Sequence, residues 1–161
     1  MQWRTTLTSI ACTGVLLGLA GCGGNKLTEA SVQEAITQAD QASQRRDLPF
    51  FEQLLAPDAV ATLDMRAANI PEPLQLNKSQ YLQLMKVGWD AVGSNYRMER
   101  SNVRIDITPS GKSASVSATV SEFTTFQGTP SNSTSHQSLT YALIKDKLQV
   151  TRINVELLTL Q

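Results

Sequence analysis

Apolar residues recur every three or four positions in the first half of the chain, and this spacing predicts helices. Ser31 and Glu34 predict a capping box at the start of a helix over residues 28–45. A short second helix is expected over residues 49–55 and is ended by Pro57. The apolar stripe of the first helix is narrow and rich in Ala: Val32, Ala35, Ile36, Ala39 and Ala42.

Residues 58–64 predict a first strand, and a proline-containing loop follows at residues 69–73. Asn77 and Gln80 open a third helix with another capping signature, and Gly93 is expected to end it. The apolar face of this helix is the heaviest of the three: Tyr81, Leu84, Met85, Trp89 and Val92.

Beyond Asn95 apolar and polar residues alternate, and a period of two predicts strands. The stretch 129–135, which is rich in Ser and Asn, is expected to be a loop. Helices followed by antiparallel strands predict an α+β domain in which a curved sheet wraps helices on one face. Four such strands are expected, around residues 103–107, 114–120, 139–143 and 150–158.

Three segments, together with the first helix, carry a resemblance to a known superfamily. They are residues 50–60, the helix that ends in Gly88-Trp89, and the strand entry that begins at Gly111-Lys112. Over roughly residues 28–158 the chain resembles the nuclear transport factor 2-like, or SnoaL-like, superfamily. The resemblance implies a cone whose concave sheet face and about three N-terminal helices enclose a pocket. It does not select an activity, because cyclases, isomerases, dehydratases and non-catalytic binding modules share this fold.

The amino terminus has the layout of a secretory signal peptide, with a positive charge at Arg4 and an apolar run over residues 10–19. This run is roughly half the length that a membrane-spanning helix needs. Leu19-Ala20-Gly21-Cys22 resembles the lipobox of bacterial lipoproteins, which implies cleavage between Gly21 and Cys22 and acylation of Cys22. Two or three acyl chains make a stable membrane anchor. An ordinary signal peptide with a chance cysteine, or an uncleaved anchor, is the alternative.

This interpretation divides the chain into a signal peptide (1–21), an acylated cysteine with a short linker (22–27) and one domain (28–161). In bacterial lipoproteins an Asp directly after the acylated cysteine retains the protein at the inner membrane, and this chain has Gly23 at that position. The resemblance therefore implies an outer-membrane protein that faces the periplasm. The lipid bilayer is therefore an expected partner, through Cys22.

Composition narrows the possible partners and cofactors. The 161 residues give room for one domain, and 14 basic against 14 acidic residues leave no basic excess for nucleic-acid binding. Cys12 would leave with the signal peptide and Cys22 would be acylated, so no thiol would remain in the domain for a disulfide or a metal. With His136 as the single histidine, neither a metal nor another cofactor is expected.

Catalytic members of the resembled superfamily usually place an Asp–His pair, or a comparable acid and base, inside the cone. His136 ends the predicted polar loop and is expected at the rim. Glu122 continues the apolar phase of its strand, so it would point into the pocket, where burial suits a carboxyl group to acid or base work. Alternatively, a bulge would bury Phe123 instead, or Glu122 would lie partly exposed beside Arg152 or Arg104.

Three hypotheses of function follow. The first is a membrane-anchored periplasmic lipoprotein whose domain binds a small apolar ligand or a partner without catalysis. The second is a SnoaL-like enzyme of isomerase, cyclase or dehydratase type, acting on an apolar molecule with Glu122 as general acid or base. The third is a structural envelope protein recognised through its surface. Candidate pocket-lining residues are Tyr81, Trp89, Val120, Glu122 and Tyr141.

A group of three basic residues is a candidate for a separate binding site. Arg97, Arg100 and Arg104 are close in sequence and are interrupted by Glu99. Mixed charges on a strand favour an ordinary solvated surface, and binding of anionic headgroups is the alternative.

Overall fold

A computed structural model describes residues 26–92, 95–126 and 128–161. The predicted signal peptide, Cys22 and Gly93 lie outside the described residues. Within the described part, no helix is long and apolar enough to cross a bilayer.

The helices form close to where the apolar periodicity predicts them. They are α1 (Glu29–Arg45), α2 (Leu48–Leu54) and α3 (Lys78–Ala91), with a short 3-10 turn at Arg66–Ala68. The capping box of α3 at Asn77 and Gln80 is confirmed, because each side chain accepts a hydrogen bond from the other's backbone N–H. The capping box predicted for α1 is wrong by three residues, since Thr28 is the N-cap and Ser31 is its partner.

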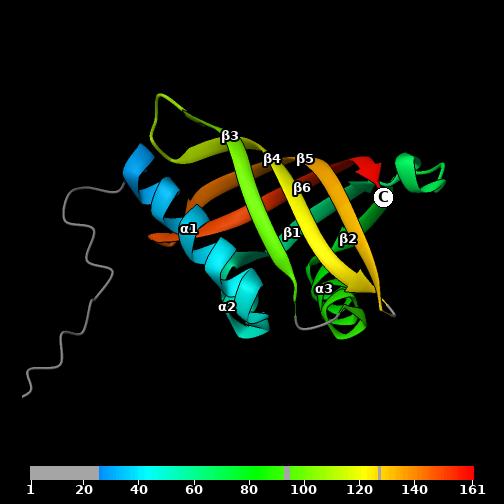
Figure 1. Ribbon diagram of the computed structural model, residues 1–161. Coiled ribbons are helices and arrows are strands. Elements are labelled where there is room, and N and C mark those ends of the chain that lie inside the picture. Colours follow the sequence, from blue (N-terminus) through cyan, green and yellow to red (C-terminus); the bar gives the residue numbers. More distant parts are fainter. Residues whose placement is uncertain (1–25, 93–94, 127) are drawn as a thin grey trace, which may run out of the picture.

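Six strands form one sheet in the order β2-β1-β6-β5-β4-β3 (Figure 1). All neighbouring strands are antiparallel except β1 and β6, which are parallel. The strands are β1 (Leu55–Asp64), β2 (Leu74–Asn77), β3 (Arg97–Ile107), β4 (Ser113–Phe126), β5 (Thr129–Ile144) and β6 (Lys147–Leu160).

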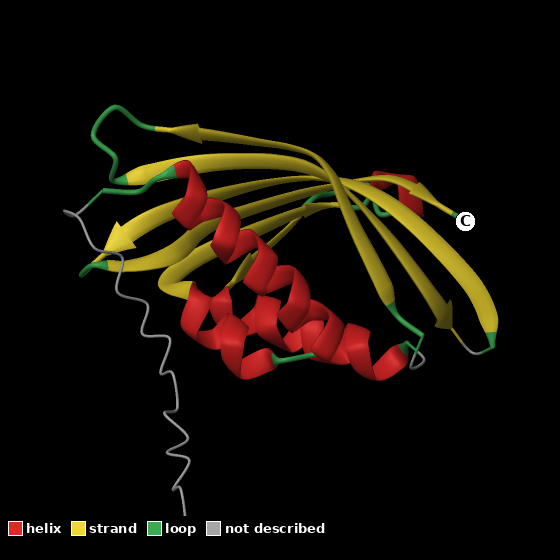
Figure 2. Ribbon diagram, turned by 60° about the vertical axis from the view of Figure 1, so that its left-hand side comes forward, coloured by secondary structure: helices red, strands yellow, loops and turns green. Residues whose placement is uncertain are grey.

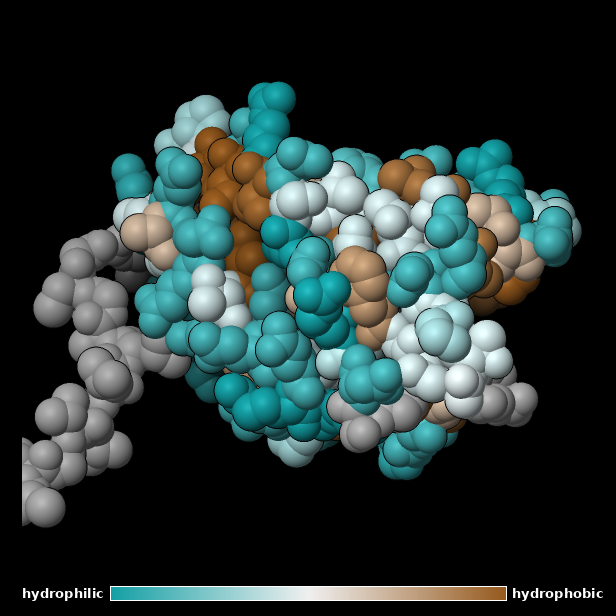
Figure 3. Space-filling model, in the orientation of Figure 1, coloured by the Kyte–Doolittle hydropathy of each residue, from teal (hydrophilic) through white to brown (hydrophobic). Residues whose placement is uncertain are grey.

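The sheet is strongly curved, and the helices lie against its concave face (Figure 2). The core fills the space between α1 and the sheet, with Val32 and Ile36 from the helix against Val116 and Tyr141 from the strands. In the space-filling view an apolar strip lies between α1 and the end of β3, surrounded by polar side chains (Figure 3). This architecture confirms the predicted α+β class with a curved sheet that wraps helices.

The loop predicted at residues 129–135 is wrong, because these residues are the first half of β5. Phe126 of β4 pairs with Thr129, and Gly128 in the turn between them has φ +83°, a conformation that glycine adopts without strain. The pairing with β4 then continues without a register shift to Ala142. Ser and Thr are compatible with a strand when a neighbouring strand supplies the hydrogen-bond ladder. The short strand β2 was also not predicted.

A bulge in β3 changes which side chains face the core. The register with β4 shifts between Ser101 and Arg104, and Asn102 in the shift has φ +52°. Ile105 therefore packs against the core, whereas Val103, predicted to share its face, is 38% exposed. Leu84 likewise departs from the predicted apolar face of α3 and is 44% exposed.

Candidate functional site

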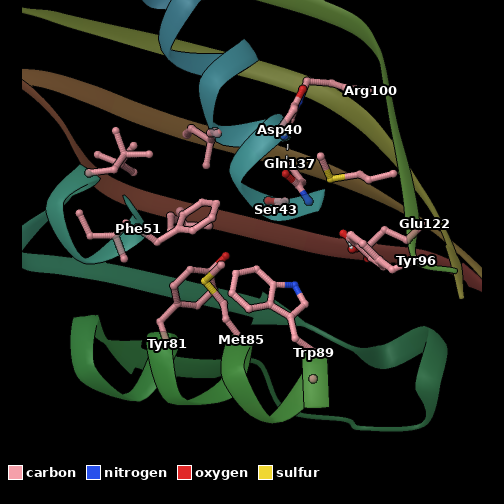
Figure 4. Close-up of a pocket in the computed structure, with 18 of the residues that line it drawn as sticks. Asp40, Ser43, Phe51, Tyr81, Met85, Trp89, Tyr96, Arg100, Glu122 and Gln137 are labelled. Atoms are coloured by element: carbon pink, nitrogen blue, oxygen red, sulfur yellow. Dashed lines mark hydrogen bonds and ion pairs between the residues drawn. The ribbon is translucent and has the colours of Figure 1, made fainter. Parts of the chain in front are cut away.

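A cavity of about 340 Å³ lies between the helices and the concave face of the sheet. Its volume is at the lower end of the range of pockets that hold small organic ligands. Side chains from all three helices and from β1, β3, β4, β5 and β6 line it (Figure 4).

One wall of the cavity is aromatic. Tyr81, Met85 and Trp89 follow each other at intervals of four residues, so they project from the same face of α3 into the cavity (Figure 4). Phe51 of α2 is buried, and its ring centroid lies 5.9 Å from that of Trp89 at an interplanar angle of 55°. This tilted arrangement is favourable for aromatic rings, and it joins α2 to α3 at the cavity.

An ion pair joins helix α1 to strand β3 at the border of the cavity. Nε and Nη2 of Arg100 on β3 donate to Oδ1 of Asp40 on α1, over 3.0 and 2.8 Å. Nη1 of Arg100 lies 3.4 Å from Oε1 of Gln137 on β5. The side chains are only 11% (Arg100) and 24% (Asp40) exposed. This pair of charges is therefore largely neutralised within the protein.

A second polar pair faces the same space. The Tyr96 hydroxyl donates a 2.7 Å hydrogen bond to Oε1 of Glu122. Burial, and then the negative charge of Glu122, raise the pKa of Tyr96, so this phenol stays protonated and remains a donor. Burial also raises the pKa of Tyr81 and of Tyr141, each to about 12, which marks the cavity as a poorly solvated environment.

Four of the five candidate pocket residues lie on the cavity: Tyr81, Trp89, Glu122 and Tyr141. Val120 is fully buried and is not among the lining residues. Glu122 faces inward because the alternation of β4 continues to it without a bulge in its pairing with β5. Neither arginine considered as its partner contacts it: Arg104 pairs with Asp106, and Arg152 is exposed.

The chain's single histidine does not reach the cavity. His136 is exposed on β5, opposite Thr119 of β4 and Glu156 of β6, while its neighbour Gln137 lines the cavity. The Asp–His pair usual in catalytic members of the resembled superfamily therefore does not form here. Asp40 has an arginine as its partner instead.

The three arginines considered as an anion-binding group lie apart. Arg100 faces the cavity, whereas Arg97 pairs with Glu99 and stacks 4.3 Å from the centre of the Phe123 ring. Among the described residues no group of three or more His, Cys, Asp or Glu could hold a metal ion.

The sequence did not place Asp40, Arg100 or Gln137 on the cavity, although Arg100 was named there within the basic group. A signal for Asp40 was present, because it lies four residues after Ile36 on the apolar side of α1. Arg100 lies on the same face of its segment as Tyr96 and Met98. The bulge that follows shifts the alternation by changing the register with β4, so the apolar pattern of the later residues does not predict this face.

Comparison with known proteins identifies the fold. No protein-family model and no curated protein sequence matches the chain. Solved structures do: a nuclear transport factor 2-like protein from Cytophaga hutchinsonii has a TM-score of 0.65 at 14% identity, over 82% of this chain and 100% of that one. A putative scytalone dehydratase from Novosphingobium aromaticivorans has a TM-score of 0.68 at 10% identity, over 82% and 85%.

A third similar structure is the hexachlorocyclohexane dehydrochlorinase LinA-type3 from Novosphingobium barchaimii. Its TM-score is 0.66 at 13% identity, over 82% of this chain and 87% of that one. Sequence identities this low support a shared fold but are no evidence for a shared activity. The curved sheet, the three helices on its concave face and these similarities together show that the chain has the nuclear transport factor 2-like cone fold.

Proposed function

We propose that this chain is a membrane-anchored periplasmic lipoprotein whose cone binds a small, largely apolar ligand without catalysis. The observation that carries the proposal is the cavity between α3 and the sheet, with its aromatic wall of Phe51, Tyr81 and Trp89. A few polar groups in a mostly apolar cavity fix the orientation of a ligand, and this one has Glu122 and the Tyr96 hydroxyl in such positions.

The titratable side chains that line the cavity favour a binding function over catalysis. The only imidazole of the chain is exposed on the sheet, and Asp40 is held by two nitrogen atoms of Arg100. The oxygen atoms of this carboxylate are therefore already engaged in a charge-assisted pair within the protein. Relatives in fold include named dehydratase and dehydrochlorinase structures, so the fold itself permits either role.

The anchor rests on the sequence, and the geometry of the first described residues is compatible with it. The Leu27 N–H donates a 2.6 Å hydrogen bond to the carbonyl oxygen of Gly111, which ties the start of the domain to the β3–β4 turn. The residues between Cys22 and this point span at most about 14 Å. Helix α1 leads away from this end, and Asp40 lies about 18 Å along its axis from Thr28. An acylated Cys22 would thus hold one end of the cone at the bilayer and leave the cavity at the other.

Identification of co-purified small molecules tests the ligand proposal. We expect mass spectrometry of a solvent extract from the purified protein to show an apolar compound. Met85→Trp, which fills the cavity, should lose it, and Leu84→Trp on the exposed side of the same helix should retain it. A protein that carries no compound and binds none from a panel of apolar metabolites would contradict the proposal.

An enzyme remains the second candidate because Glu122 places a carboxyl group on the cavity beside the Tyr96 hydroxyl. A carboxyl group and a phenol are a possible base and acid for an isomerisation or an elimination. Turnover of apolar substrates that falls at least a hundredfold in Glu122→Gln, with binding unchanged, would establish this function. Equal turnover in the variant would remove Glu122 from any mechanism.

A further inference from the structure

We propose that the ligand of the cavity carries a cationic amine group, which binds the carboxylate of Glu122. This inference rests on the proposed binding function and adds the chemical class of the ligand to it. It follows from the charges that face the cavity and from the partners that the protein already gives them.

The charged side chains of the lining are two carboxylates and one guanidinium group: Asp40, Glu122 and Arg100. Asp40 and Arg100 satisfy each other through three contacts of 2.8 to 3.1 Å. The remaining nitrogen of Arg100, Nη1, is directed to the side-chain oxygen of Gln137. An anionic ligand would have to compete with Asp40 for the guanidinium group, so Arg100 is not the ligand's anchor.

Glu122 is the charged group of the cavity lining that has no oppositely charged partner among the described residues. Among the described residues its one hydrogen-bond partner is the Tyr96 hydroxyl, on Oε1, and it forms no ion pair. A carboxylate has about four acceptor positions on its two oxygen atoms. A partly buried carboxylate without a cation is unfavourable, and an ammonium group in the cavity would compensate both its charge and its open acceptor positions.

The surroundings of Glu122 suit a cation with an apolar body. Rings of Tyr81 and Trp89 border the same cavity, and aromatic faces attract ammonium groups. After burial, the negative charge of Glu122 raises the pKa of Tyr81, whereas the positive charge of Arg100 lowers it. The amine would lie at Glu122 and the apolar body against α3.

Three matched probes test this: phenylpropylamine, phenylpropanol and phenylpropanoate, which differ only in the head group. The full-length chain is made by cell-free synthesis with Trp3→Phe, because Trp3 and Trp89 are the only two tryptophans. The fluorescence of Trp89 then reports on the cavity, and the affinity of each probe is obtained from its titration.

We expect the amine to bind about tenfold more tightly than the alcohol, and the carboxylate to bind most weakly. Glu122→Gln should abolish the preference for the amine, and the variant should still bind the alcohol, which also shows that it is folded. Glu156→Gln removes the same charge from the exposed face of β6 and should keep the preference.

The outcomes separate the two proposals. Equal affinity for the amine and the alcohol, or tightest binding of the carboxylate, would overturn the cationic head group and leave the binding function in place. Binding of none of the probes would overturn the head group and count against an apolar-ligand site as well. A preference for the amine that persists in Glu122→Gln would show that another group recognises the cation.

Discussion

Asp40 on α1 accepts hydrogen bonds from Nε and Nη2 of Arg100 on β3, although 60 residues separate the two in sequence. The pair ties the C-terminal half of α1 to an edge strand of the sheet beside the cavity. Both side chains are mostly shielded from water. Each of the two charges is therefore compensated by the other, and removal of one leaves the other without a counter-ion.

Asp40→Asn is therefore expected to lower the free energy of unfolding by about 2–4 kcal/mol, because it leaves the Arg100 charge largely buried without a counter-ion. The measurement is urea-induced unfolding followed by circular dichroism. Asp106→Asn removes one partner of the exposed pair with Arg104 and should leave the unfolding midpoint nearly unchanged.

A double variant separates charge from packing. Asp40→Leu combined with Arg100→Met should recover most of the lost stability, because no unpaired charge remains. A double variant that is less stable than Asp40→Asn would show that the pair matters through its geometry and not through mutual neutralisation.

Part of the cavity lining could be predicted from the sequence. In a regular strand, every second side chain faces the same side along the whole length of the strand. Ala114, Val116, Ala118 and Val120 are all buried, and the same phase carries Glu122 to the cavity. The aromatic wall on α3 follows from a spacing of four residues in the same way. Local periodicity is sufficient where an element is regular.

Contacts between distant segments could not be predicted in this way. Whether Asp40 meets Arg100 depends on how α1 crosses β3, and the bulge at Asn102 changes the phase of β3 between Arg100 and Ile105. The polar residues 129–135 form a strand because β4 and β6 lie beside them, which their own composition does not reveal.

Acylation should depend on Cys22 and not on Cys12. In cells labelled with a fatty acid, Cys22→Ala should accumulate as an unprocessed, unlabelled precursor, because the sulfur that accepts the lipid is absent. Cys12→Ala lies within the predicted signal peptide and should be cleaved and labelled normally. Normal processing and labelling of Cys22→Ala would disprove the lipoprotein assignment.

Of the glycines that the structure describes, Gly111 is expected to be the least tolerant of substitution. It has φ +68°, and an added Cβ would lie 2.8 Å from Cβ of Lys26. Gly111→Ala should lower the free energy of unfolding by about 1–2 kcal/mol through backbone strain and displacement of Lys26.

Gly88→Ala provides the matched control, since Gly88 lies within α3 and nothing is within 4 Å of the added Cβ. This change should raise the free energy of unfolding by about 0.5–1 kcal/mol, because alanine favours the helix. If both variants lost stability equally in urea unfolding, crowding and strain at Gly111 would not be the cause.

The tyrosines around the cavity predict a loss of stability in strong base. Burial raises the pKa of Tyr81 and of Tyr141 to about 12, from an ordinary value of 10.0 that each regains on unfolding. Between these values the folded state keeps protons that the unfolded state releases, so stability is constant below pH 10 and falls as the pH rises toward 12. Each tyrosine contributes up to about 1.4 kcal/mol per pH unit to this fall.

Tyrosinate absorbance and circular dichroism, recorded together from pH 8 to 12.5, measure this effect. We expect little tyrosinate signal near pH 10 and a single late step that coincides with unfolding, since all three tyrosines of the chain border the cavity. Tyr81→Phe should make the stability fall less steeply with pH, because one of the titrating phenols is removed. A gradual titration centred at pH 10 in a still-folded protein would show instead that the cavity is freely solvated, which would also weaken its assignment as an apolar binding site.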